Sequence, residues 1–316
     1  MLSINREALR ITKMLLDNPE LYGVTIERLP SGATVIDTGL KTRGGYLTGL
    51  RITEIAMGGL GTAHLTFMNY GALRLSSIVV ETSHPTAALF ASQLAGWRIK
   101  VGEYSADGSG PARALACKPS KLFQRIGYRD SSDEAVLILE TSAEPPDEAA
   151  VLIAKACNVE PKNLYLILTS TSSLAGSIQI SGRIVETAFF RLDYLGLDPK
   201  RALYAVGCAP IMPPHPDWRR AMGRYEDALT YGGAANFLVD LEEDEELRRY
   251  AEQTPSSNSK DYGKPSYEIY SSVEFDFTKI DPALFAPAYI TLTNLRTGTT
   301  YSRGQINIEL LRKALE

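Results

Sequence analysis

The chain has 316 residues, enough for one large domain or two of ordinary size, and 44% of them are hydrophobic while 22% are charged. A net charge of −4 argues against general nucleic-acid binding, which needs clustered Lys and Arg to neutralise phosphates. No stretch approaches the roughly 18 consecutive apolar residues that span a bilayer, and the first residues lack a secretion-signal pattern, so we expect a cytoplasmic protein that binds neither membrane nor nucleic acid.

Residues that bind metals or cofactors are few. The chain has 3 His and 3 Cys, without a CxxC or HxxxH pair, so a transition-metal site is not expected. The segment MGGLG at 57–61 misses the GxGxxG spacing, and no GxxxxGK[ST] motif occurs. If the chain is an enzyme, we expect it to work with side chains and water, without a metal or cofactor.

The first half of the chain mixes helical and strand-like patterns. The spacing of apolar residues predicts a helix over residues 1–18. Short alternating runs broken by Gly predict strands at 24–29, 33–39 and 46–59. A further strand at 73–83 is followed by a helix that Pro85 begins, a return strand at 97–105 and a loop at 107–116.

A second passage repeats this order of elements. It predicts a strand at 135–142, a helix led by Pro145 and Pro146, and a return strand at 163–172. Both passages carry Glu-Thr-Ser at a strand end, at 81–83 and 140–142. We interpret them as two related α/β halves, about residues 75–125 and 133–195, whose small-residue loops face one cleft.

The last third begins with a Pro-rich loop. The patterns then predict, in order, a strand at the end of 221–241, a charged surface helix at 242–253, a polar loop from 255, and a hairpin at 285–307 that turns at Thr297 and Gly298.

The segment GSIQISGRIVETAFF at 176–190 is the strongest candidate for chemistry. If a helix begins near Gly182, Arg183 and Glu186 lie on one face of it. A guanidinium keeps a neighbouring carboxylate ionised and oriented, which suits a group that must position and deprotonate water. The alternative is an ordinary surface ion pair worth about 0.3–0.5 kcal/mol. The apolar and small residues around the pair are unlike a solvated face and favour the functional interpretation.

Two loops offer groups to an anion. In DGSGPARALA (107–116), Ser109 and Gly110 precede Pro111, so backbone N–H groups at a helix start, reinforced by Arg113, are suited to a negative charge. A tight turn with Ser109 as the helix N-cap explains the same residues equally well. In DYGKP (261–265), Lys264 is a candidate for a ligand carboxylate or phosphate, although a simple turn is the preferred interpretation.

Six segments together resemble one family. They are, in chain order, ITEIAMGGL (52–60), GSGPARALA (108–116), GSIQISGRIVET (176–187), AMGR (221–224), DYGKP (261–265) and IDPALFAPA (280–288). With their spacing they are similar to the methenyl-tetrahydromethanopterin cyclohydrolases of methanogens and related organisms with C1 metabolism, over nearly the whole chain.

The resemblance implies a two-domain α/β fold with a cleft between the domains, no metal or redox cofactor, and a homotrimer. We place the domains at about 1–130 and 131–316, with a C-terminal segment allowed to join the first. The implied reaction is reversible water addition to 5,10-methenyl-tetrahydromethanopterin, a pterin carrier of a C1 unit, to give the 5-formyl form. Arg183 and Glu186 are the implied catalytic pair, with Glu186 deprotonating the water and Arg183 holding it in place.

Further residues are expected to contact this substrate. Beside the pair, Ser177, Gln179 and Ser181 are expected to contact the pterin. The anionic part of the carrier is expected to contact Ser109, Gly110, Arg113 and Lys264. Two other functions stay open: a pterin-binding protein without catalysis, and a formyl-transfer enzyme that needs a second ligand.

Overall fold

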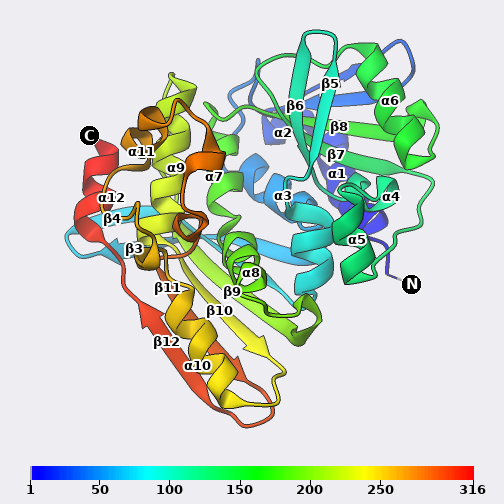
Figure 1. Cartoon of the computed structure of the whole chain (residues 1–316). Coiled ribbons are helices and arrows are strands. Elements are labelled where there is room, and N and C mark those ends of the chain that lie inside the picture. The colour runs from blue at the N-terminus through cyan, green and yellow to red at the C-terminus, as the bar shows by residue number, and fades with distance from the viewer. Residues whose placement is uncertain (1) are drawn as a thin grey trace. The chain divides into compact units, whose positions relative to one another are not determined.

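The computed structural model describes residues 2–316 and divides into two compact units. The first unit combines Met1–Thr62 with Thr86–Gln179, and the second combines Ala63–Pro85 with Ile180–Glu316. Each unit contains one six-stranded sheet with its own helices (Figure 1). The expected two-domain α/β fold is therefore confirmed.

The sheet of the first unit has the order β1-β2-β8-β7-β6-β5. Its strands are β1 (Thr25–Arg28), β2 (Thr34–Asp37), β5 (Trp97–Val101), β6 (Tyr104–Ser109), β7 (Ala135–Glu140) and β8 (Leu164–Thr169). The central strands β2, β8 and β7 run parallel, whereas β1, β6 and β5 join the edges antiparallel. Strands β7 and β8 consist of continuous apolar runs because they lie in the parallel centre of the sheet, where both faces are covered.

Helices cover both faces of this sheet. The helices of the unit are α1 (Ile4–Asp17), α2 (Pro19–Tyr22), α3 (Tyr46–Ala56), η1 (Thr86–Gln93), α4 (Ala112–Ala116), α5 (Ser120–Ile126), α6 (Asp147–Cys157), η2 (Pro161–Asn163) and α7 (Leu174–Ser181), whose last residues lie in the second unit. One buried cluster joins α4 and α6 to one face, and another joins α1 and α3 to the other. Burying both faces stabilises the sheet by the hydrophobic effect.

The sheet of the second unit has the order β12-β11-β10-β9-β4-β3. Its strands are β3 (Gly61–Tyr70), β4 (Leu73–Thr82), β9 (Ala202–Pro210), β10 (Ala234–Val239), β11 (Tyr289–Asn294) and β12 (Thr300–Gly304). Of the pairs from β12 to β4, only β10 with β11 is parallel. Along β10 and β11 every second residue is buried, as expected where helices cover one face more fully than the other.

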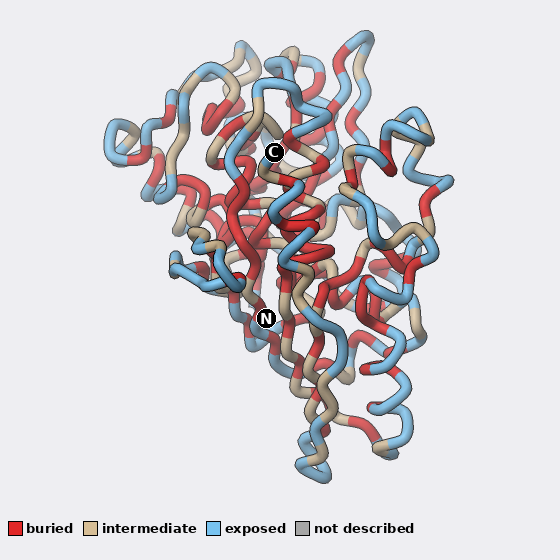
Figure 2. The backbone as a smooth tube through the Cα atoms, turned by 90° about the vertical axis from the view of Figure 1, so that its left-hand side faces the viewer, coloured by how far each residue is buried: buried red, intermediate tan, exposed pale blue. Residues whose placement is uncertain are grey.

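The second unit also has its own helices. They are α8 (Ile184–Tyr194), η3 (Pro199–Arg201), α9 (Trp218–Gly232), α10 (Asp244–Gln253), η4 (Ser256–Asn258), α11 (Ser266–Ser272), η5 (Phe277–Lys279), η6 (Pro282–Leu284) and α12 (Ile308–Leu315). Helix α8 packs on the sheet through Phe189, whose ring stacks on Phe237 of β10 at 5.7 Å between centroids. Exposed segments, pale blue in Figure 2, include loops that connect these elements. No helix within residues 2–316 combines the length and apolar character needed to cross a bilayer.

Most of the expected elements are confirmed, and the strand at 46–59 is wrong. Residues Tyr46–Ala56 form α3, in which Ile52, Ile55 and Ala56 are buried at helical spacing. The β-branched residues of this segment imitate a strand, but Thr53 donates its hydroxyl to the carbonyl of Gly49 at 2.9 Å and so fits the helix. The loop expected at 107–116 is also wrong in part, because it contains the end of β6 and all of α4.

The limits of the units differ from those expected from sequence. The expected boundary at residue 130 lies inside the first unit. The strands before and after it, β6 and β7, pair in the same sheet, with Asp107 opposite Glu140. The proposed half at 75–125 is divided, since β4 belongs to the second sheet while β5 and β6 belong to the first. The two Glu-Thr-Ser segments therefore lie at the ends of strands that belong to different sheets. The hairpin turn at Thr297 and Gly298 is confirmed, with Gly298 at φ +77°.

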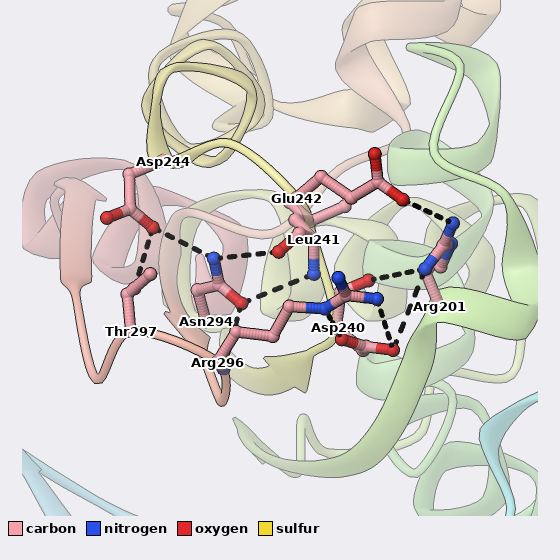
Figure 3. Close-up of polar contacts among 8 residues, drawn as sticks. All are labelled: Arg201, Asp240, Leu241, Glu242, Asp244, Asn294, Arg296 and Thr297. Atoms are coloured by element: carbon pink, nitrogen blue, oxygen red, sulfur yellow. Dashed lines mark hydrogen bonds and ion pairs between the residues drawn. The ribbon is translucent and has the colours of Figure 1, made fainter.

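A polar network closes one end of the second sheet (Figure 3). The fully buried Asn294 side chain donates to the carbonyl of Leu241 at 3.1 Å and to Asp244 at 2.8 Å, and it accepts from the Leu241 N–H. Beside it Arg296 forms an ion pair with Asp240. The network satisfies the polar groups of the hairpin and the start of α10, so its role is structural.

We expect Asn294→Ala to lower the free energy of unfolding by about 2–4 kcal/mol, because it leaves the buried Leu241 N–H and carbonyl without partners. Urea unfolding measures this loss. Thr297→Ala is the matched control, since Thr297 is exposed and donates one hydrogen bond to Asp244. Equal unfolding midpoints for the two variants would contradict the structural role of Asn294.

Candidate active site

Arg183 and Glu186 lie at the start of α8. Arg183 is the N-cap residue, α8 begins at Ile184, and Glu186 lies in the first turn. Arg183 Nη1 lies 3.5 Å from Glu186 Oε2. The predicted helix start near Gly182 and the predicted proximity of the two side chains are therefore confirmed. The N-terminus of the helix adds its own positive potential near the Glu186 carboxylate.

Burial separates this ion pair from ordinary surface pairs. The Arg183 and Glu186 side chains are 13% and 10% exposed, whereas the Arg248 and Glu245 side chains, also three residues apart, are 47% and 71% exposed. Charge interactions are stronger where solvent is excluded, and leaving such a charge without a partner is costly. The pair is thus not a solvated surface pair, and it provides a carboxylate whose position is restricted by a neighbouring guanidinium.

Two glycines allow α8 to reach the sheet. A Cβ atom at Gly233 would lie 2.2 Å from Ile184 Cδ1, and one at Gly207 would lie 2.7 Å from Val185 Cγ2. Any side chain at these positions would displace the first turn of α8. The close approach therefore determines where Arg183 and Glu186 lie within the second unit.

Two carboxyl groups of α9 belong to the same electrostatic environment and were not anticipated from sequence. Burial raises the pKa of Glu226 to about 7, the charge of Glu186 raises it further, and hydrogen bonds with Thr230 and Tyr270 lower it. Burial also raises the pKa of the adjacent Asp227 to about 7, while hydrogen bonds from Ser266 oppose the shift. The available signal was the position of Glu226 and Asp227 between Tyr225 and the segment Ala228–Leu229 of α9.

These acidic residues do not indicate a metal site. Within residues 2–316, no group of three or more His, Cys, Asp and Glu side chains is arranged to hold a metal ion. The carboxyl groups of Glu226 and Asp227 instead bind neighbouring protein groups. Thr230 Oγ1 lies 3.4 Å from Glu226 Oε1, and the Ser266 N–H donates to Asp227 at 2.8 Å.

The residues expected to contact a pterin are divided by the unit boundary, which falls within α7. Ser177 and Gln179 belong to the first unit, and Ser181 belongs to the second. All three are buried. The Ser181 hydroxyl donates to the carbonyl of Pro210 at 2.9 Å, so the fold itself uses this group. A shared site for residues of both units stays a prediction, as does the expected cleft.

The GSGPAR segment is a strand-to-helix turn whose polar groups bind the protein. The N–H of Gly110 donates to the Ser92 carbonyl at 2.8 Å, and Ser109 ends β6 without acting as the expected N-cap, a position that Pro111 takes. Arg113 is fully buried and donates to the carbonyls of Phe90 and Ser92 at 3.1 and 3.0 Å. These contacts give Arg113 a structural role, and the expected contact with an anion stays a prediction.

Lys264 lies in an exposed turn. Gly263 before it has φ +105°, and the Lys264 carbonyl accepts a hydrogen bond from the Tyr231 hydroxyl. The turn that the sequence favoured is therefore present. The Lys264 side chain is exposed, so a contact with an anionic ligand stays a prediction.

We expect Gly233→Ala to destabilise the second unit by about 1–3 kcal/mol, because the new methyl group overlaps Ile184 Cδ1 in a packed contact. Adding Ile184→Val removes Cδ1 and is expected to recover part of the loss in urea unfolding. Gly45→Ala is the control, since no atom lies within 4 Å of its Cβ position and its φ of 177° is extended. An equal loss for both alanine variants would contradict the importance of this close approach.

The raised pKa values predict a stability change with pH. Because the folded pKa of Asp227 exceeds its ordinary value of 3.8, the folded state holds an extra proton between about pH 4 and pH 7, and stability decreases as pH rises through this range. We expect Asp227→Asn to raise the free energy of unfolding by roughly 2–4 kcal/mol at pH 8 and by much less at pH 5. Asp133→Asn, at an exposed position, is the control. A gain of the same size at both pH values would contradict the assignment.

Known proteins are similar to this chain along its whole length. The family described as Cyclohydrolase (MCH) matches residues 3–315. The methenyltetrahydromethanopterin cyclohydrolase of Methanocaldococcus jannaschii is 41% identical over 318 residues, covering 100% of this chain and 98% of its own. Those of Methanothermobacter marburgensis and Methanosphaerula palustris are 39% and 42% identical, each covering 99% of both chains. The chain belongs to the MCH cyclohydrolase family.

Proposed function

We propose that this protein is a methenyltetrahydromethanopterin cyclohydrolase of C1 metabolism. It adds water reversibly to 5,10-methenyl-tetrahydromethanopterin and forms 5-formyl-tetrahydromethanopterin. The names of relatives at about 40% identity over their full length support this reaction. The observation that carries the proposal is the Arg183–Glu186 pair at the start of α8, in which Glu186 is buried and Arg183 is largely shielded from solvent.

The chemistry of the substrate explains why such a pair suffices. The methenyl carbon is bonded to two nitrogens of a cationic ring and is already electrophilic, so the proposed reaction needs no metal or redox cofactor. Glu186 orients the attacking water and accepts one of its protons as the C–O bond forms. Arg183 holds the Glu186 carboxylate in place and stabilises its charge.

The tetrahedral adduct then opens. The bond from the former methenyl carbon to one ring nitrogen breaks, the hydroxyl becomes a carbonyl, and that nitrogen gains a proton. The other nitrogen keeps the formyl group. Of the two protons of water, one stays on the product and one is released to solvent, because a cation has become neutral at the reacting ring. The reverse reaction follows the same steps, since no high-energy bond is consumed.

The remaining assignments of the substrate site are part of the proposal. Ser177, Gln179 and Ser181 contact the pterin. The exposed Lys264 binds an anionic group of the carrier. The same role is proposed, separately, for the turn of Ser109, Gly110 and Arg113. The protein acts in the cytoplasm as a homotrimer, and analytical ultracentrifugation tests the oligomeric state.

We expect Glu186→Gln to lower kcat by ~10²–10⁴-fold, because the variant loses the general base while keeping the shape of the side chain. The decay of methenyl-tetrahydromethanopterin absorbance measures the rate, and equilibrium binding of the same substrate shows that the site persists. Glu245→Gln changes an exposed ion pair with the same spacing and is the matched control.

Each other outcome identifies a different function. Substrate binding without turnover by the wild type would indicate a pterin-binding protein. Turnover that requires a second ligand would indicate formyl transfer. Equal kcat values for wild type and Glu186→Gln would contradict the proposed role of Glu186 as the general base.

A further inference from the structure

A positively charged segment contains α5 of the first unit. Residues 118–129 include four basic residues and no Asp or Glu, although the whole chain has a net charge of −4. The four are Lys118, Lys121, Arg125 and Arg129, and all are exposed. Within residues 2–316, the side chains of Lys118, Lys121 and Arg129 form no ion pair, so their charges are available to a ligand.

This segment borders a cavity at the two ends of α5. Cys117, which ends α4, has φ +51°, and Gly127, which ends α5, has φ +69°. Both residues are left-handed, so the chain changes direction before and after α5. The resulting cavity of about 270 Å³ is lined by Cys117, Ser120, Phe123, Gln124, Gly127 and Arg129.

The groups that line the cavity are suited to an oxyanion. Arg129 brings a planar guanidinium, which can donate two parallel hydrogen bonds to a phosphate, and Ser120 and Gln124 bring further donors. No Asp or Glu is among the lining residues. The buried guanidinium of Arg113 lies 5.7 Å from the centroid of the Phe123 ring and adds to the positive potential.

A second cavity of the first unit lacks this charge balance. It has a volume of about 300 Å³, and Lys162 lines it together with Glu160 and Asp133. Lys162 Nζ lies 2.6 Å from Glu160 Oε2, so a carboxylate of the same cavity compensates its charge. Beside the α5 cavity, Asp130 follows Arg129 in sequence but accepts hydrogen bonds from the backbone N–H and the side-chain amide of Asn5. The charge of Arg129 therefore has no such partner.

We propose that the cavity beside α5 binds a small phosphorylated molecule. Its volume suits a phosphate group with a few further atoms, whereas larger ligands need larger pockets. The exposed Lys118 and Lys121 attract the anion to this part of the surface. The ligand is either the anionic part of the C1 carrier, a case that rests on the function proposed above, or a separate phosphorylated molecule.

Inorganic phosphate is the first probe. We expect calorimetry to show saturable binding with a Kd of the order of 1 mM. Arg129→Gln is expected to raise this Kd ~10-fold, because the ligand loses a charged hydrogen-bond donor. Lys162→Gln is the matched control and is expected to change the Kd less than about 2-fold, since it removes a charge that Glu160 already compensates. The absence of saturable binding, or equal Kd values for wild type and Arg129→Gln, would overturn the proposal.

Cys117 reports the charge of the cavity without an enzyme assay. Iodoacetate is an anionic alkylating reagent and iodoacetamide is a neutral one, so the ratio of their rates at Cys117 measures the local potential. We expect this ratio to fall ~3-fold in Arg129→Gln, and phosphate to slow the alkylation of Cys117 in the wild type. Mass spectrometry of the peptides follows Cys208, in the second unit, as the internal reference. An unchanged ratio, or a reaction that phosphate does not slow, would contradict the proposed site.

Hydrolysis kinetics distinguish the two sources of the ligand. If the carrier occupies the cavity, Arg129→Gln raises KM for methenyl-tetrahydromethanopterin ~5-fold at unchanged kcat, and inorganic phosphate competes with the substrate. If a separate molecule occupies it, the variant keeps the wild-type KM although it has lost phosphate binding. Both results support the site. Protection of Cys117 by phosphate in a wild type that does not hydrolyse the substrate would also support the site and would overturn only the proposed function.

Discussion

The first turn of α8 lies against β9 and the start of β10 with no room for a side chain at Gly207 or Gly233. This approach fixes Ile184 and Val185 on the sheet, and the stacked rings of Phe189 and Phe237 continue the contact along the helix. Arg183 and Glu186 are carried on the same turn. The positions of Arg183 and Glu186 therefore depend on the absence of a Cβ atom at Gly207 and at Gly233, because a closely packed interior cannot accommodate added volume without displacing its neighbours.

The same packing explains the electrostatics of the second unit. Glu186 is held at a helix N-terminus beside a guanidinium, which stabilises its negative charge. Burial raises the pKa of Glu226 to about 7, against the opposing effect of the hydrogen bonds from Thr230 and Tyr270. For a substrate that is itself a cation, the proposed mechanism needs a negative charge that accepts a proton, and Glu186 at the start of α8 is the group proposed for this role.

Sequence patterns were most informative where local chemistry decided the structure. The apolar runs of β7 and β8, the hairpin at Gly298 and the pairing of Arg183 with Glu186 follow from side-chain periodicity and turn preference. The same patterns failed at α3, whose β-branched residues are helical because Ile52 and Ile55 pack against the sheet. They also did not reveal that the Arg113 guanidinium binds the carbonyls of Phe90 and Ser92, because no sequence rule places these groups beside it.

The sequence by itself determined the α/β class, most strands and helices, the family and the residues of the proposed catalytic pair, because these depend on residue types at short spacing. Only the tertiary structure decided which strands share a sheet, that each unit is built from two separate stretches of chain, and that Asp227 is buried. Strand pairing and desolvation arise from residues far apart in the chain, such as Asp107 with Glu140 or Glu226 with Glu186. These interactions form only when the chain has folded, so a local sequence pattern cannot predict them.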